Sequence, residues 1–132
     1  MAAAGVMAFA IATSITVMQR AFLALDTARN ISYAAQIMQS ELEKVRLLPW
    51  TTIGTYASSE TPVTTTLTID SRFTSNAYIG SRFTLTRTAS TLHSNTMMQI
   101  KLTVTWNSYD GRTLSRSYVT YYGQNGLYDY FI

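Results

Sequence analysis

The first 18 residues constrain this chain most, because they contain no charged residue and read MAAAGVMAFAIATSITVM. The helical pattern continues without a break to Leu48, and the composition turns amphipathic from Arg20 onward. As a helix, residues 1–18 would span about 27 Å at ~1.5 Å per residue, just under the ~30 Å hydrocarbon core of a bilayer. They lack the basic start and the break of a cleaved secretory signal. We therefore expect one helix over residues 1–48, whose apolar first half resides in a membrane or a helix bundle.

The second half of this helix carries an apolar stripe. Between residues 31 and 45, apolar side chains recur at steps of three and four, the period of one helix face. Asp26–Arg29 and Glu43–Arg46 can form ion pairs three residues apart on the polar side. Pro49 ends the helix, because it has no backbone N–H to donate. The predicted helix-to-sheet contacts are Ile31, Ala34, Ala35, Met38, Leu42 and Val45.

The remainder of the chain, residues 49–132, has the pattern of a small β-sheet. Residues 50–62 show no period, which predicts a connecting loop. Alternating apolar and polar residues predict strands over 63–69 and 82–86. The clearest alternation points five residues inward, namely Met98, Ile100, Leu102, Val104 and Trp106.

Asp110-Gly111 favours a hairpin turn after that strand. The return strand, at about residues 112–122, is less regular, and we expect Val119 and Tyr121 to point inward. The fold class is therefore α+β, with a long N-terminal helix whose C-terminal half packs on a small antiparallel β-sheet head. The predicted parts are an apolar stem (1–25), an amphipathic continuation (26–48) and a head (49–132), which includes the loop 50–62 and the tail 123–132. We expect Tyr128, Tyr130 and Phe131 of the tail to lie against a surface.

The ionisable residues give no sign of catalysis. The chain has 10 Lys and Arg against 7 Asp and Glu, and the net charge of +3 is spread over helix and head. Cysteine is absent, which excludes disulfides and thiolate metal sites. His93 is the single histidine and has no serine and aspartate arranged around it, and the acidic residues are scattered. We expect no catalytic residue, no cofactor and no metal.

Two weaker partner hypotheses come from the head. Its basic residues and tyrosines could contact nucleic-acid phosphates and bases, although solvated strand faces are the favoured explanation. These residues are Arg72, Arg82, Arg87, Lys101, Arg112 and Arg116, with Tyr78 and Tyr118. The stretch Thr51–Thr68 holds eight threonines and could carry O-linked sugar.

The order of these parts resembles type IV pilins and pseudopilins. TARNISYAAQIMQSELEKVRLLPWTTIG (27–54) is similar to the helix-to-loop transition of prepilin-type proteins, KLTVTWNSYDGRTLSRSYVTYY (101–122) to their closing hairpin, and GQNGLYDYFI to their tails. The family's basic leader, its Phe-Thr-Leu start and its glutamate at the fifth mature position are not in this sequence, where position 5 is Gly5. The frequent cysteine pair and the helix-kinking proline are also missing. We expect the sequence to begin a few residues inside the mature helix.

The resemblance implies a structural subunit of a type IV pilus-like helical filament, which assembles with copies of itself through its N-terminal helices. Such a subunit is first a single-pass protein of the inner membrane, is handled by the pilus assembly machinery, and ends in an extracellular filament on the cell surface. Small residues allow close approach of neighbouring helices. The implied filament-core contacts are Ala4, Gly5, Ala8, Phe9, Ala12, Ile15, Val17, Phe22 and Leu25.

A soft point in the stem is predicted at Thr13, Ser14, Ile15 and Thr16, because hydroxyl groups there can bond the carbonyl four residues back and bend the helix. By the resemblance, local melting of the helix in a filament would fall at these residues. Other roles stay open: a pseudopilin of a secretion system, a minor or DNA-uptake pilin, or a membrane-anchored binding domain of the cell envelope that does not polymerise.

Overall fold

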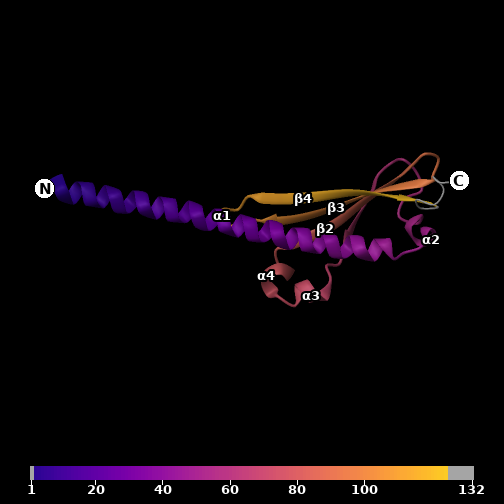
Figure 1. Ribbon diagram of the computed structural model, residues 1–132, viewed down its shortest axis with the longest axis horizontal. Coiled ribbons are helices and arrows are strands. Elements are labelled where there is room, and N and C mark those ends of the chain that lie inside the picture. The colour runs from indigo at the N-terminus through magenta and orange to yellow at the C-terminus, as the bar shows by residue number, and fades with distance from the viewer. Residues whose placement is uncertain (1, 125–132) are drawn as a thin grey trace, which may run out of the picture.

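Helix α1 (Ala2–Arg46) runs past the end of the sheet, so that its first half projects from the rest of the molecule (Figure 1). The computed structural model describes residues 2–124. Its strands form one antiparallel sheet in the order β1-β2-β3-β4, which confirms the predicted α+β class. The predicted aromatic contacts of the tail lie outside the described residues. The other elements are α2 (Trp50–Ile53), β1 (Val63–Leu67), α3 (Ser71–Thr74), α4 (Ala77–Gly80), β2 (Phe83–Leu92), β3 (Met97–Asn107) and β4 (Thr113–Gly123).

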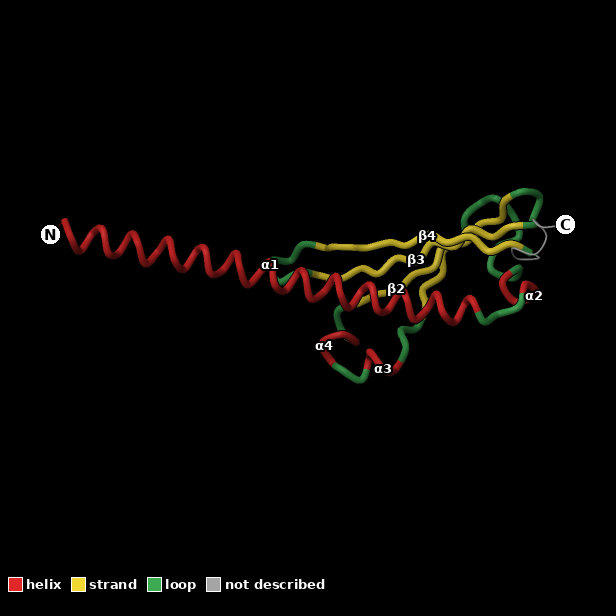
Figure 2. Tube along the Cα trace, viewed as in Figure 1, coloured by secondary structure: helices red, strands yellow, loops and turns green. Residues whose placement is uncertain are grey.

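The second half of α1 runs along the sheet (Figure 2), and the core lies between this part of the helix and one face of the sheet. The even-numbered residues of β3 form its centre, and Ile100, Leu102 and Val104 are fully buried. Helix α1 contributes Ala34 and Ile37, which are 0% and 2% exposed. Burial of a valine, leucine or isoleucine side chain contributes about 1.5–3 kcal/mol. The head therefore depends on α1 for one wall of its core.

The helix face differs from the predicted stripe at one residue. Met38, Leu42 and Val45 are buried and Ile31 is half-buried against the core, but Ala35 is exposed. Consecutive helical residues are rotated by about 100°, so that the burial of Ala34 turns Ala35 away from the sheet. The prediction that Ala35 packs on the sheet is wrong for the isolated chain.

Strand β4 faces the other way from the prediction. Val119 and Tyr121 are 42% and 57% exposed. The register pairs Met98 with Tyr122 and Ile100 with Thr120, and directly paired residues point to the same face of a sheet. Tyr122 therefore points toward the helix side, where its hydroxyl donates to the carbonyl of Leu48 at 2.7 Å.

The segment between β1 and β2 contacts the side of α1 through Asp70 and Tyr78. It contains α3 and α4, two four-residue helices that lie beside α1 in Figure 1. Asp70 caps α3 by accepting from the backbone N–H of Arg72 at 2.9 Å. It also lies 3.2 Å from Lys44 of α1. Hydrogen bonds from the Arg72 side chain and backbone, and then from Lys44, hold the pKa of the Asp70 carboxyl well below its usual range.

The shared core predicts where the chain can be divided. Residues 26–132 should fold cooperatively without the stem, whereas residues 49–132 should not, because they lose the helix that covers β3. Thermal unfolding followed by circular dichroism, with the dispersion of amide NMR signals, distinguishes the two outcomes. A cooperative transition in residues 49–132 would contradict the shared core.

Asp70 predicts a pH dependence of stability. Because its folded pKa is lowered, its contribution to the free energy of unfolding is present above the unfolded value of about 3.9 and is lost as pH falls toward the folded value. Denaturant titrations should show a constant difference between the native chain and Asp70→Asn above about pH 5, and a shrinking one below about pH 4. The control is Glu60→Gln, because the Glu60 carboxylate forms no ion pair within residues 2–124.

Candidate assembly surface and stem–head junction

The stem of α1 (residues 2–25) is apolar and uncovered. An 18-residue window of α1 is long and apolar enough to cross a membrane, and none of it is buried in the head. Phe9 and Leu25 are 75% and 67% exposed. Exposed apolar surface on this scale marks a site that contacts lipid or protein. The stem is therefore the candidate assembly surface.

The predicted filament-core residues all lie on this exposed stem, and the structure does not distinguish among them. Ala4, Gly5, Ala8, Phe9, Ala12, Ile15, Val17, Phe22 and Leu25 are exposed in the isolated chain.

The predicted soft point lies within continuous helix. Thr13 donates from its hydroxyl to the carbonyl of Phe9 at 2.9 Å, and Thr16 to that of Ala12 at 3.0 Å. Ser14 makes the same contact with Ala10. These bonds satisfy the hydroxyl groups on an apolar helix, and melting in a filament stays a prediction.

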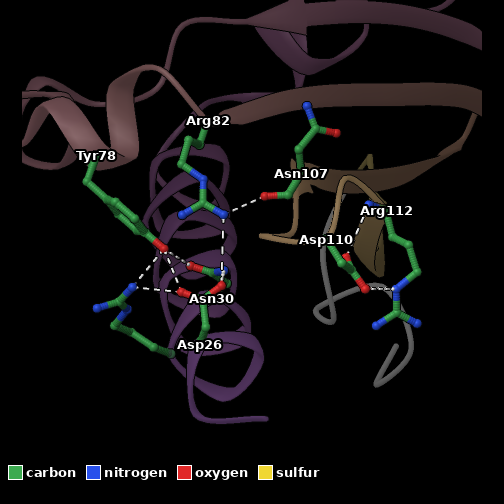
Figure 3. A network of polar contacts seen from close by, with 8 residues as sticks. Asp26, Asn30, Tyr78, Arg82, Asn107, Asp110 and Arg112 are labelled. Carbon is green, nitrogen blue, oxygen red and sulfur yellow. Dashed lines mark hydrogen bonds and ion pairs between the residues drawn. The ribbon is translucent and has the colours of Figure 1, made fainter. Parts of the chain in front are cut away.

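The stem meets the head at a buried carboxylate. Asp26 is 8% exposed and is the first buried residue of α1 in the described range. Its Oδ1 accepts from Arg29 at 2.8 Å and from the Tyr78 hydroxyl at 2.9 Å, and its Oδ2 accepts from the Asn30 amide at 3.2 Å. Figure 3 shows these groups converging between α1 and the segment that carries α4. A buried charge requires such partners, because desolvation without them is costly.

Two guanidinium groups lie over the Tyr78 ring. The distance from Cζ to the centroid of the Tyr78 ring is 4.7 Å for Arg29 and 4.4 Å for Arg82. Arg29 also donates to the Tyr78 hydroxyl, and this bond, aided by Asp26, raises the pKa of Arg29 above its ordinary value. Arg82 lies 4.0 Å from Asp26 and donates to the backbone carbonyl of Asn107. The junction thus connects α1, α4, the turn before β2 and the end of β3.

A groove runs from this junction along the stem. It measures about 900 Å³ and lies between the stem and the turn that joins β3 to β4. Its lining residues are Gln19, Phe22, Leu23, Leu25, Asp26, Arg29, Tyr109 and Asp110. The hairpin tip is ordered by Gly111, whose φ of 83° suits glycine, and by Asp110. The Arg112 backbone amide and guanidinium both donate to Asp110 and lower the pKa of its carboxyl.

Sequence reasoning found only one contact of the junction. It predicted the Asp26–Arg29 ion pair, which the structure contains, and also Glu43–Arg46, which is not among the ion pairs of residues 2–124. The sequence groups Tyr78 and Arg82 only within a possible nucleic-acid face, and it does not connect them with Asn30 or Asp26. One signal for the junction is present in the sequence. Asp26, Asn30 and Ala34 follow one another at steps of four residues, so the helix face that packs inward at Ala34 is polar at Asn30 and Asp26.

The fold has a pilin-like architecture, since a long N-terminal helix packs on a small antiparallel sheet. Searches against protein-family models, curated proteins and solved structures found no match to this chain. The likeness therefore rests on the arrangement of elements.

Tyr78→Phe should destabilise the junction. It keeps the ring under both arginines but removes a hydroxyl that contacts Asp26, Asn30 and Arg29. We expect the free energy of unfolding to fall by about 1–3 kcal/mol, with faster amide hydrogen exchange in residues 71–82. Thermal unfolding in detergent and exchange mass spectrometry measure the two effects.

The matched control is Tyr109→Phe, because Tyr109 is 79% exposed and its hydroxyl makes no hydrogen bond within residues 2–124. This variant should change stability by less than about 0.5 kcal/mol. Equal effects of the two substitutions would show that the Tyr78 hydroxyl has no special role.

Proposed function

We propose that this chain is a structural subunit of an extracellular, type IV pilus-like filament that assembles through the stem of α1. The observation that carries the proposal is the uncovered apolar stem, joined without a break to the helix that completes the head's core. A head built on such a helix cannot move independently of it. Packing of stems therefore fixes the arrangement of heads.

The stem offers enough apolar surface to hold a polymer together. Each ~40 Å² of apolar area removed from water contributes about 1 kcal/mol. Contacts between unlike surfaces of identical subunits do not close on themselves unless the rotation forms a ring, so they generate helical filaments. The absence of charge in residues 1–18 suits both lipid and a helix bundle.

The same stem would anchor the subunit before assembly. Its length and composition allow it to cross a membrane. In the proposed sequence of events, the subunit resides in the inner membrane as a single-pass protein, and the pilus assembly machinery transfers it to the filament. A pseudopilin or a minor pilin would use the same contacts, whereas a membrane-anchored binding domain would keep its stem in lipid.

Ala8→Asp tests the proposal. A carboxylate at an exposed position of the stem would have to be buried between helices or in lipid, at a cost of about 2.5–3.5 kcal/mol on insertion scales. We expect cells that express the full chain to form filaments visible by electron microscopy of sheared surface material. The Ala8→Asp variant should form none.

Ala8→Ser is the matched control, because serine is similar in size and uncharged, and it should retain filaments. Normal filaments from Ala8→Asp would refute stem packing. A native chain that stays in the membrane fraction and never forms filaments would favour the anchored binding domain.

A further inference from the structure

A second, smaller pocket lies beside the junction. It measures about 370 Å³ and is lined by Tyr78, Arg82, Asn107, Ser108 and Tyr109. The Arg82 guanidinium lies 4.4 Å from the centroid of the Tyr78 ring and 5.8 Å from that of Tyr109. The hydrogen bond to the Asn107 carbonyl fixes the orientation of the Arg82 guanidinium and uses only part of the donor capacity of this group.

The junction has more positive than negative charge. Arg29 and Arg82 supply two guanidinium groups, and Asp26 supplies one carboxylate. Arg29 makes the close contact with Asp26 at 2.8 Å, while Arg82 is 4.0 Å away. At the neighbouring hairpin tip, Arg112 already neutralises Asp110 at 2.6 Å. Arg82 is therefore the cation with spare capacity for an anion, although its side chain is only 20% exposed.

Ser108 adds a buried hydroxyl group to the lining of this pocket. It is 6% exposed, and its Oγ has no hydrogen-bond partner in the described part of the chain. Ser108 Oγ also lies close to the Asp110 carboxyl and helps to lower the pKa of that group. Buried hydroxyl groups normally have a partner. Rotation of its side chain toward the pocket would let a ligand oxygen satisfy it.

Tyr109 joins this pocket to the apolar groove along the stem. It lines both, with Arg82 on one side and Phe22 and Leu25 on the other. The pocket that contains Arg82 thus continues into the apolar groove along the stem. The ligand that matches has a phosphate or carboxylate at one end and a hydrocarbon chain at the other.

We propose that the junction binds an anionic phospholipid, with its phosphate at Arg82 and one acyl chain in the groove beside Phe22 and Leu25. Phosphate oxygens form strong charge-assisted hydrogen bonds with guanidinium groups. The stem of a second copy fits this site less well, because residues 1–18 contain no anion to meet Arg82. The lipid site does not require a filament.

The depth of the site agrees with a lipid headgroup. With the uncharged residues 2–18 in the hydrocarbon core, Phe22–Leu25 would lie roughly 6–11 Å farther along the helix, at the boundary between the acyl chains and the headgroups. Tyr109 reaches back along the stem to these residues. Tyrosine rings are enriched at this level of membranes.

Native mass spectrometry of the full chain in detergent tests the proposal. The probes are phosphatidylglycerol, diacylglycerol of the same chain length, and inorganic phosphate. We expect a retained one-to-one complex with phosphatidylglycerol, at least fivefold weaker retention by Arg82→Gln, and no retention of diacylglycerol or phosphate. Lys101→Gln removes an exposed cation from the opposite face of the sheet, and should bind as the native chain does.

Tyr109→Ser provides a second test, because this exposed side chain can be truncated without disturbing the core. It should also weaken retention, so that the proposal stays testable if Arg82→Gln does not fold. Equal retention by the native chain, Arg82→Gln and Tyr109→Ser would overturn the site. Binding of inorganic phosphate without lipid would overturn the acyl-chain contact, and equal binding of diacylglycerol would overturn the role of Arg82.

Discussion

The packing of α1 against β3 is the contact on which the rest of the structure depends. Ile37 and Val45 on the helix, and Ile100 and Leu102 on the strand, are at most 2% exposed. Packing of this density transmits force, because interiors have few voids into which side chains can yield. A load applied to the stem must therefore reach the sheet through the same helix. In this architecture, the helix that carries the exposed stem also completes the core of the head.

The polar junction marks where that core ends. Asn30 and Asp26 lie on the same helix face as Ala34, one and two turns nearer the stem. They contact Tyr78 through polar groups, whereas Ala34 and Ile37 contact the core with hydrocarbon. A polar cluster with matched partners fixes the register of the helix against its neighbours, since a shift would leave Asp26 buried without donors. At the other end, Asp70 and Lys44 fasten the same segment to α1. The two attachments lie about 27 Å apart along the helix axis, at ~1.5 Å per residue over 18 residues.

Much of the fold could be predicted from the sequence, because its longest elements have strong periods. The alternation from Met98 to Trp106 predicted β3 and its inward face, and this face is buried. The face of β4 could not be read in this way, because only pairing with β3 decides whether Val119 or Tyr122 points inward. Helices α3 and α4 are too short to show a period. The contact between Asp26 and Tyr78 spans 52 residues, and no local pattern encodes it.

In the proposed function only the stem changes its surroundings, and the chemistry of the junction accounts for this limit. Residues 1–18 carry no charge, so their transfer from lipid to a bundle of like helices involves little change in electrostatic solvation. Asp26, Arg29 and Arg82 cannot follow them into an apolar interior, because each charge would lose its hydration. In the proposed function, these residues would therefore limit how far the helix enters either a membrane or a filament core. The proposed lipid site lies at this limit, where a phosphate can meet Arg82 while its acyl chain remains beside the stem.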